Sequence, residues 1–217
     1  MRLTLIGMAG TGKSYWSKRL EEKGFKRLCC DESIAAKLET ELTRRDGTRL
    51  TMGQWMGFPY QEHYREREAT YLACEISVVS EIAARLEGQD AGQDIVVDTA
   101  GSVIYTGDDL LKRLGRVTTI VHLSTPPEAE DRLLRAYLKR PHPMLWQGMF
   151  QQAPEESTEE AFARCYPRLL LSRRRLYERY AQVTLDYHER REEGFGVREF
   201  LDRVLKTKEG SNGIGEG

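Results

Sequence analysis

The stretch that decides the fold is Gly7-Met-Ala-Gly-Thr-Gly-Lys13-Ser14, which matches the pattern G-x-x-x-x-G-K-[ST]. The apolar segment Arg2 to Ile6 before it predicts a strand, and Lys13 to Glu22 after it predicts a helix that Gly24 ends. In such a turn, glycines let backbone N–H groups point inward, and the helix N-terminus adds partial positive charge. The stretch therefore predicts a phosphate-binding loop; the alternative is a chance match in an ordinary strand-to-helix turn.

Each position of this loop has an expected role toward a nucleotide. Lys13 would reach the β- and γ-phosphates, and the Ser14 hydroxyl would ligate Mg²⁺. We therefore expect ATP and Mg²⁺ as cofactors. The residues expected to bind them are Gly7, Gly10, Thr11, Gly12, Lys13 and Ser14.

Asp98 is a second candidate for the magnesium site. It closes the apolar run Ile95-Val-Val-Asp98, which predicts a buried strand beside the loop. A carboxylate at the carboxyl end of such a strand is well placed to hold the water shell of Mg²⁺. The alternative is an aspartate that merely caps the following turn.

Strands alternate with helices along the rest of the chain, as a parallel sheet requires. The further strands are expected at 25–30, 94–98, 116–123 and 182–186. The further helices are expected at 33–43, 62–86, 108–114, 128–139, 159–180 with an interruption near Pro167, and 197–206. This order predicts a three-layer α/β/α fold around a five-stranded parallel sheet, formed by a single domain over 1–207 with a disordered tail over 208–217.

Composition excludes several classes of protein. The 217 residues contain 33 Lys plus Arg and 34 Asp plus Glu, a formal net charge of -1, which disfavours a general nucleic-acid or membrane-surface binder. No apolar run approaches the roughly 18 residues of a membrane span, and no signal peptide is recognisable. We expect a cytoplasmic protein whose cysteines are reduced thiols, because Cys29, Cys30, Cys74 and Cys165 have no C-x-x-C spacing.

From residue 1 to about 205 the chain resembles the shikimate kinases, members of the nucleoside-monophosphate-kinase-like group of P-loop proteins. In that family the second strand ends in D-x-D. Here Asp31 matches the second acid, while Cys29 replaces the first. The resemblance implies that Asp31 binds the acceptor hydroxyl that attacks the γ-phosphate. The family's F-R-x-x-E resembles Tyr64-Arg65-Glu66-Arg67-Glu68, which implies that Arg65 binds the acceptor carboxylate.

Three later segments extend the resemblance. The family's G-G-G resembles Ala100-Gly101-Ser102, which retains only the middle glycine, and its R-P resembles Arg140-Pro141. The segment Arg173-Arg-Arg-Leu-Tyr177-Glu-Arg-Tyr-Ala181 resembles R-x-P-L-Y-x-x-x-A. The resemblance implies that Gly101 contacts the acceptor, that Arg140 stabilises the transferred phosphate, and that Arg173 forms a second carboxylate clamp. It also implies that adenine lies between Arg132 and the loop after Asp186.

Two segments are longer than the family usually has. We expect an acceptor-binding insertion at about 31–68 and a mobile lid at about 140–158, whose composition is typical of a surface segment. Their surplus aromatic and methionine side chains either reshape the acceptor pocket or pack on each other as a cap. These side chains are Trp55, Met56, Phe58, Tyr60, Met144, Trp146 and Phe150.

Taken together, the motifs predict an enzyme that transfers the γ-phosphate of Mg·ATP to a hydroxyl of a small, carboxylate-bearing metabolite. Lys13, Asp31 and Arg140 are the predicted catalytic residues. One alternative is a kinase of the same fold for another acid, a sugar or a nucleotide. Another is a nucleotide-binding module without catalysis, for which Cys29 in place of an acid is the main argument. The oligomeric state stays open, with a monomer favoured.

Overall fold

The computed structural model describes residues 1–88, 92–140 and 142–212, so Pro141 of the expected Arg140-Pro141 pair lies outside the described residues. The strands are β1 (Arg2–Ile6), β2 (Lys26–Cys29), β3 (Ile95–Asp98), β4 (Thr119–Leu123) and β5 (Val183–Leu185). The helices are α1 (Lys13–Glu21), α2 (Cys30–Lys37), α3 (Glu39–Leu42), α4 (Met52–Met56), α5 (Tyr64–Glu87), α6 (Asp108–Val117), α7 (Glu130–Lys139), α8 (Thr158–Tyr180) and α9 (Val197–Asn212). Short 3-10 helices occur at η1 (Val103–Tyr105), η2 (Pro127–Ala129) and η3 (Glu189–Arg191).

The five strands form one parallel sheet in the order β2-β3-β1-β4-β5, which confirms the predicted fold class. In the register, Asp98 at the end of β3 pairs with both Leu5 and Cys29, while Ile6 pairs with His122. The carboxyl ends of β1 to β4 are therefore level with one another. The turns that follow these strands meet at one edge of the sheet, where open α/β sheets bind ligands.

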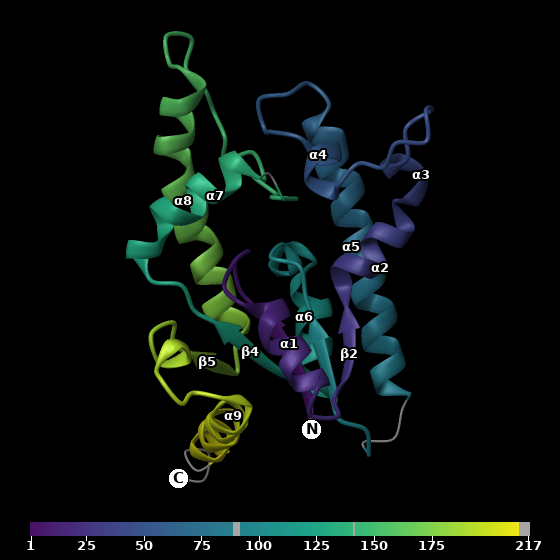
Figure 1. Cartoon of the computed structure of the whole chain (residues 1–217), viewed down its shortest axis with the longest axis vertical. Coiled ribbons are helices and arrows are strands. Elements are labelled where there is room, and N and C mark those ends of the chain that lie inside the picture. The colour runs from purple at the N-terminus through teal and green to yellow at the C-terminus, as the bar shows by residue number, and fades with distance from the viewer. Residues whose placement is uncertain (89–91, 141, 213–217) are drawn as a thin grey trace.

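Helices cover both faces of the sheet because side chains alternate along each strand. On one face, Leu3 and Leu5 pack with Trp16 of α1 and Phe200 of α9. On the other face, residues of β3 and β4 pack with α5, α6 and α8. Figure 1 shows α7 and α8 on one side of the molecule and α3, α4 and α5 on the other.

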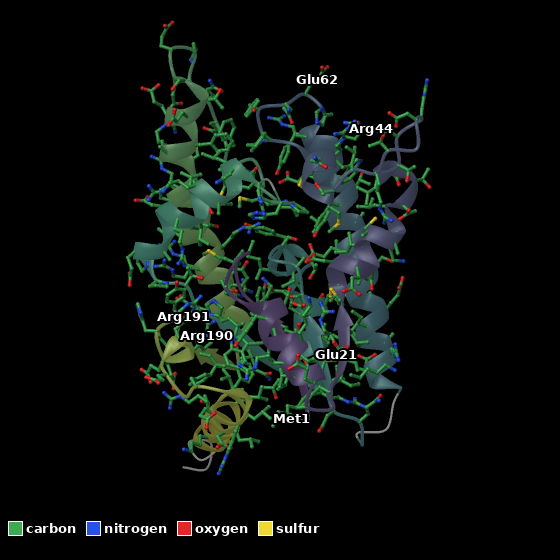
Figure 2. All side chains as sticks on the ribbon, viewed as in Figure 1. Met1, Glu21, Arg44, Glu62, Arg190 and Arg191 are labelled. Carbon is green, nitrogen blue, oxygen red and sulfur yellow. The ribbon has the colours of Figure 1, made fainter. Side chains whose placement is uncertain are left out.

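The segment from α2 to α5 is the expected acceptor-binding insertion. Its loops carry Arg44 and Glu62 toward the end of the molecule opposite Met1 (Figure 2). The region expected as a loop before α5 contains α4, which begins with a capping box between Thr51 and Gln54.

Two helices continue where the sequence predicts a break or an end. Helix α8 runs from Thr158 to Tyr180 with Pro167 inside it, so the expected interruption near Pro167 is wrong. Buried contacts on both sides of Pro167, from Phe162 to Leu170, offset the cost of a missing N–H. Helix α9 continues to Asn212, past the expected start of a disordered tail, and residues 213–217 lie outside the described part.

The segment expected as a mobile lid is instead packed into the core at its start. Met144, Leu145 and Trp146 are at most 3% exposed. The Tyr64 hydroxyl lies 2.6 Å from the Met144 carbonyl oxygen and accepts a hydrogen bond from the Trp146 N–H at 3.0 Å. The Gln147 N–H donates to Glu68 at 3.0 Å. These contacts join the segment to the first turns of α5, so the prediction of a surface lid is corrected for these residues.

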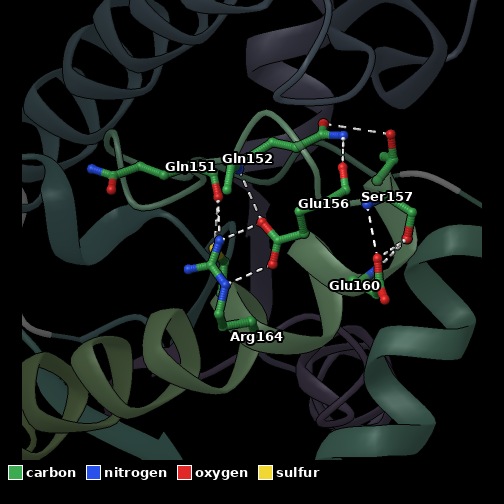
Figure 3. Close-up of polar contacts among 9 residues, drawn as sticks. Gln151, Gln152, Glu156, Ser157, Glu160 and Arg164 are labelled. Atoms are coloured by element: carbon green, nitrogen blue, oxygen red, sulfur yellow. Dashed lines mark hydrogen bonds and ion pairs between the residues drawn. The ribbon is translucent and has the colours of Figure 1, made fainter.

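The rest of this segment is joined to the start of α8 (Figure 3). The Arg164 guanidinium donates to both carboxylate oxygens of Glu156, at 2.7 and 2.6 Å, and to the Gln151 carbonyl at 2.7 Å. Ser157 and Glu160 form a capping box. The loop therefore has its own polar framework.

Aromatic side chains from both insertions form one cluster, here named the aromatic cap. Its ring centroids lie between 4.8 and 6.5 Å apart. The two insertions thus pack on each other, as one of the two alternatives predicts. The aromatic cap consists of Phe58, Tyr60, Tyr137, Trp146, Phe150, Phe162 and Tyr166.

Among the described residues, no helix has the length and apolar character needed to cross a membrane.

Candidate active site

Two adjoining cavities lie at the edge where the strand ends meet. The first, here named the transfer cavity, has a volume of about 330 Å³ and is lined by Lys13, Ser14, Asp31, Tyr71 and Gly101 among others. The second, the cationic cavity, has a volume of about 370 Å³ and is lined by Lys139, Arg140 and Arg173 together with apolar side chains. Both cavities share Ala9, Gly10 and His142. The two cavities therefore meet at the predicted phosphate loop.

The backbone of the phosphate loop requires its glycines. Gly10 and Gly12 have φ angles of 79° and 98°, in the left-handed region that other residues rarely adopt. At Gly7 (φ 146°) a Cβ atom would lie 2.8 Å from the Leu123 carbonyl oxygen, so a side chain there would separate the loop from β4. The Thr11 hydroxyl donates to the Met8 carbonyl at 2.9 Å and closes the turn. This conformation fits a polyphosphate on the N-terminus of α1.

Lys13 lies over the loop that precedes it. Its Nζ donates to the carbonyl oxygens of Gly7 and Met8 at 2.8 and 3.0 Å. Burial lowers the pKa of Lys13, against the opposing effect of the Asp31 and Asp98 carboxylates. The ammonium group is thus held at the phosphate loop by backbone dipoles and by two acids.

Arg190 braces the phosphate loop from the opposite end of the chain. It follows β5 and lies beside Arg191 (Figure 2), and it is only 6% exposed. Its guanidinium donates to the carbonyl oxygens of Thr11 at 2.8 Å and Ser124 at 2.7 Å, and to Asp186 at 3.0 Å. We did not expect this residue from the sequence, because no local pattern distinguishes it from the many exposed arginines.

Asp98 lies at the end of β3 beside the loop, as expected, but its carboxylate already has partners. Its Oδ2 accepts hydrogen bonds from Ser17 at 2.8 Å and from Arg27 at 2.9 Å. It is 3% exposed and does not line the transfer cavity. The structure thus places Ser14, but not Asp98, at the surface where a nucleotide-bound Mg²⁺ would lie.

The described residues contain no group of three or more His, Cys, Asp or Glu side chains that could hold a metal ion by itself. The donors that line the transfer cavity are the Ser14 hydroxyl and the Asp31 carboxylate. Such a set fits Mg²⁺ that is carried mainly by nucleotide phosphates and water. It does not fit a metal site built from protein ligands.

Asp31 lies in the first turn of α2 and faces Lys13 across the transfer cavity. Burial raises the pKa of Asp31, while Lys13 and a hydrogen bond from Tyr71 lower it. Gly101 lies on the same wall, and its carbonyl accepts a hydrogen bond from the Tyr177 hydroxyl. A Cβ at Gly101 would lie 3.4 Å from the Ala9 nitrogen, an ordinary van der Waals distance, so the turn after β3 lies against the phosphate loop.

Arg173 and Arg140 meet at the cationic cavity. Arg173 is 3% exposed and donates to the Leu145 carbonyl at 3.1 Å, while its Nε has no hydrogen-bond partner in the described structure. Its guanidinium lies 5.4 Å from the centre of the Tyr105 ring. Arg140 is exposed at the end of α7 and lines the same cavity. An anionic group in this cavity would contact both.

Arg65 does not reach either cavity. The buried face of α5 contains Tyr64, Tyr71 and Glu75, which are spaced i, i+7 and i+11 and so lie on one side of a helix. Arg65 follows Tyr64 in the chain, so it lies on a different side of the helix and is exposed. The predicted pair of carboxylate clamps, Arg65 and Arg173, is therefore not brought together.

Glu75 occupies the buried face of α5 near the transfer cavity. It is 0% exposed, and the Ser102 hydroxyl lies 2.5 Å from its Oε2. Its Oε1 has no hydrogen-bond partner among the described residues. Burial raises the pKa of Glu75 to about 8. The signal that could have identified it is a lone carboxylate within the apolar stripe of a predicted helix.

His142 lies at the junction of the two cavities. Burial lowers the pKa of His142 to about 4, and Arg173 and Lys13 add to the shift. The imidazole is therefore neutral near pH 7. It contributes a polar but uncharged group between two cationic side chains.

Arg132 contacts the loop after Asp186. Its guanidinium donates to the Tyr187 hydroxyl at 2.5 Å and lies 5.8 Å from the centre of that ring. Arg191 lies 3.5 Å from the centre of the same ring. Tyr187 thus contacts two arginines next to the place where the resemblance implies adenine.

No protein-family model matches the chain, and no curated protein matches it. Solved structures do match. A shikimate kinase from Acinetobacter baumannii in complex with shikimate is 21% identical with a TM-score of 0.61, covering 98% of this chain and 94% of that one. A shikimate kinase from Aquifex aeolicus is 17% identical with a TM-score of 0.57 and full coverage of both chains, 100% each. A dephospho-CoA kinase from Campylobacter jejuni is 15% identical with a TM-score of 0.52, covering 98% of each. The chain therefore has the fold of the shikimate kinases and other P-loop small-molecule kinases.

Proposed function

We propose that the protein transfers the γ-phosphate of Mg·ATP to a hydroxyl of a small acceptor that also carries a carboxylate. The observation that carries the proposal is the pairing of the two cavities. Lys13 and Asp31 face each other in the transfer cavity, and the adjoining cavity presents Lys139, Arg140 and Arg173. A molecule that spans both would place a hydroxyl at Asp31 and an anionic end at Arg173.

Bound Mg·ATP supplies the phosphoryl group and a cation that offsets its charge. The loop from Gly7 to Ser14 would hold the phosphates through backbone N–H groups, with Ser14 as the protein ligand of Mg²⁺. Lys13 would leave the Gly7 and Met8 carbonyls for the phosphates. Arg190 keeps the Thr11 carbonyl in place and thereby preserves the shape of the loop.

Asp31 would orient the acceptor hydroxyl and accept its proton. For this role the carboxylate has to be ionised, and Lys13 opposes the rise that burial causes in the pKa of Asp31. Phosphoryl transfer needs little covalent assistance, so most of the rate comes from positioning and electrostatic stabilisation. Arg140, which is exposed beside the phosphate loop, would stabilise the charge that develops on the transferred group.

The acceptor-binding side supports one alternative, a kinase for a different small molecule. Arg65 lies outside both cavities, so the second arginine predicted to bind a carboxylate is missing there. The residue of α5 that is buried near the transfer cavity is the acid Glu75. Of the two groups predicted for a carboxylate, Arg65 and Arg173, Arg173 alone lines the cationic cavity. A sugar or a nucleoside carries less negative charge than a carboxylate-bearing acceptor, so its binding would need fewer cationic side chains.

The experiment that tests the proposal is a coupled assay of ADP release with purified protein, Mg·ATP and a panel of acceptors. The panel contains shikimate, other hydroxy acids, sugars, nucleosides and dephospho-coenzyme A. We expect turnover with a hydroxy acid, and none with Lys13→Met. Turnover only with a sugar, nucleoside or dephospho-coenzyme A would favour the alternative, and ATP binding without any transfer would favour a non-catalytic module.

A further inference from the structure

The buried part of the cationic cavity is mostly apolar. Its exposed cations, Lys139 and Arg140, lie at the end of α7. Further in, Arg173 is the one cation among the described residues that line the cavity, and it is 3% exposed. The larger apolar and aromatic side chains that line it are Met8, Leu133, Met144, Tyr166 and Leu170.

Contacts with the rest of the fold hold these apolar walls in place. Leu133 lies over the phosphate loop, because a Cβ atom at Gly10 would be 3.3 Å from its Cδ2. Met144 is buried, and its carbonyl oxygen lies 2.6 Å from the Tyr64 hydroxyl. Tyr166 belongs to the aromatic cap. The apolar surface of the cavity is therefore part of the packed structure, and the aromatic cap forms one of its walls.

The cationic cavity does not offer the side chains that bind ligand hydroxyl groups. None of the described residues that line it is Asp, Glu, Asn, Gln, Ser or Thr. A ligand hydroxyl buried there would leave water without gaining a carboxylate, amide or aliphatic hydroxyl partner, which is costly. The transfer cavity differs, because Ser14, Asp31 and Tyr71 line it. We therefore expect ligand hydroxyl groups in the transfer cavity and carbon atoms in the cationic cavity.

The size of the cationic cavity suits a ring or a short chain. An apolar cavity of about 150 Å³ accommodates a benzene ring, and the cationic cavity has a volume of about 370 Å³. Arg173 has a donor left for an anionic end group, because its Nε has no hydrogen-bond partner in the described structure. The cavity thus fits an apolar carbon frame that ends in a carboxylate.

We propose that the acceptor is a hydroxy acid with an apolar carbon frame: its carboxylate binds Arg173, its ring or chain lies on the apolar walls of the cationic cavity, and its reactive hydroxyl lies at Asp31. This inference rests on the proposed phosphotransfer. The hydroxyl oxygen bonds to the γ-phosphorus as the bond between that phosphorus and the β-phosphate oxygen breaks. ADP leaves, the hydroxyl proton passes to Asp31, and the product is a phosphate ester. Sugars and polyhydroxylated acids are poor acceptors.

The preference is tested first by binding, with two acids that differ only in their hydroxyl groups. Calorimetric titrations of the full-length protein with Mg·ADP present compare 4-hydroxycyclohexanecarboxylate with its 2,3,4-trihydroxy analogue. The two added hydroxyl groups lie near the carboxylate, so they would enter the cationic cavity. We expect the Kd of the trihydroxy acid to be about 10- to 100-fold higher. Equal or tighter binding of the trihydroxy acid overturns the inference, and so does a lack of binding by both 4-hydroxycyclohexanecarboxylate and 4-(hydroxymethyl)benzoate.

Variants of α7 locate the preference in the cationic cavity. Leu133→Asn adds an amide that can bond to ligand hydroxyl groups, so we expect the ratio of the two Kd values to fall by about 2- to 10-fold. Ala136→Ser adds a hydroxyl to the same cavity at an exposed position, where no loss of folding is expected, and should lower the ratio in the same direction.

The matched control is Leu134→Asn, which changes the adjoining half-buried residue of α7 that lines neither cavity. It should leave the ratio of the two Kd values unchanged. If Leu134→Asn lowers the ratio as much as Leu133→Asn does, or if neither Leu133→Asn nor Ala136→Ser lowers it, the acids bind elsewhere and the inference is overturned.

Turnover separates this inference from the proposed function. We expect kcat/KM for ester formation, followed by ³¹P NMR, to be about 10- to 100-fold higher for 4-hydroxycyclohexanecarboxylate than for the trihydroxy acid. Equally fast phosphorylation of the trihydroxy acid overturns the apolar substrate class and leaves the proposed function intact. If the binding preference holds but neither these acids nor the acceptor panel yields a phosphate ester, the proposed function fails, and the cationic cavity remains a binding site for apolar acids.

Discussion

The two sides of the cleft are built differently. The nucleotide side is a continuous local motif, from Gly7 to Ser14, held by backbone geometry and by Arg190. The proposed acceptor side is assembled from α2, α5, α8 and the segment that begins at Met144, and these elements are joined by the aromatic cap and by Tyr64. A contiguous motif between one strand and one helix can be recognised in the sequence. Which side chains line a wall built from four distant segments depends on which face each helix turns toward the cavity.

The largest effect is expected at the nucleotide side. Lys13→Met removes the ammonium that approaches the phosphates, so we expect kcat/KM to fall by at least about 10³-fold, since a preorganised charge is lost where charge develops. Steady-state kinetics would measure this. We expect the fold to persist, because among the described residues the Lys13 side chain bonds only the Gly7 and Met8 carbonyls. Circular dichroism would check that the helix content is unchanged. Activity near the wild-type value would contradict the assignment of this loop.

On the acceptor side, Arg173→Met should raise KM for the acceptor by about 10- to 100-fold, since a hydrogen bond to a charged group contributes about 1.5–3 kcal/mol. KM for ATP should change little. The matched control is Arg65→Met, which removes an exposed guanidinium outside both cavities. If Arg65→Met instead raises KM and Arg173→Met does not, the acceptor lies on the outer face of α5.

A smaller effect is expected at the brace of the phosphate loop. Arg190→Met removes the donors to the Thr11, Ser124 and Asp186 carbonyl oxygens, so we expect the Kd for ATP to rise about tenfold. Calorimetric titration with ATP would measure it, and Arg191→Met is the neighbouring control for a general loss of positive charge. An unchanged Kd for Arg190→Met would show that the loop keeps its shape unaided.

The last prediction concerns stability and pH and does not involve a ligand. The pKa of Glu75 rises from 4.5 to about 8 on folding, so its contribution to stability is fully present below 4.5 and is lost as the pH rises through 8. Between pH 5 and 8 the free energy of unfolding should therefore fall by a few kcal/mol through this group, at about 1.4 kcal/mol per pKa unit. Glu75→Gln should remove that part of the slope in urea unfolding. Equal slopes in both proteins would show that Glu75 is ionised in the fold.

The sequence was sufficient for the sheet, the order of its strands in the chain and the phosphate loop, because each depends on local patterns. It placed Asp31, Gly101, Arg140 and Arg173 in segments that the fold does bring to one cleft. It did not show that Arg65 lies on the exposed face of α5, because a motif match of five residues does not determine which face of a long helix is buried. The apolar stripe through Tyr64, Tyr71 and Glu75 would have shown that face.

Burial of the expected lid could not be predicted from its composition. Glycine, proline and glutamine around Met144 to Phe150 are typical of a surface segment, and only the partners on α5 and α8 turn its aromatic side chains inward. The contacts of Glu75 and Arg190 could not be predicted from the sequence either. Their roles depend on contacts with residues 27 and 179 positions away, respectively.

The most direct test of the central claim is ³¹P NMR of the protein with Mg·ATP and the acceptor panel, compared between wild type and Asp31→Asn. We predict a new phosphate-ester resonance from a hydroxylated acid with the wild type. For Asp31→Asn we predict a rate lower by about 10²- to 10⁴-fold, the usual contribution of a proton-accepting side chain. If ATP gives only ADP and inorganic phosphate with every acceptor, or if Asp31→Asn transfers phosphate as fast as the wild type, the account is contradicted.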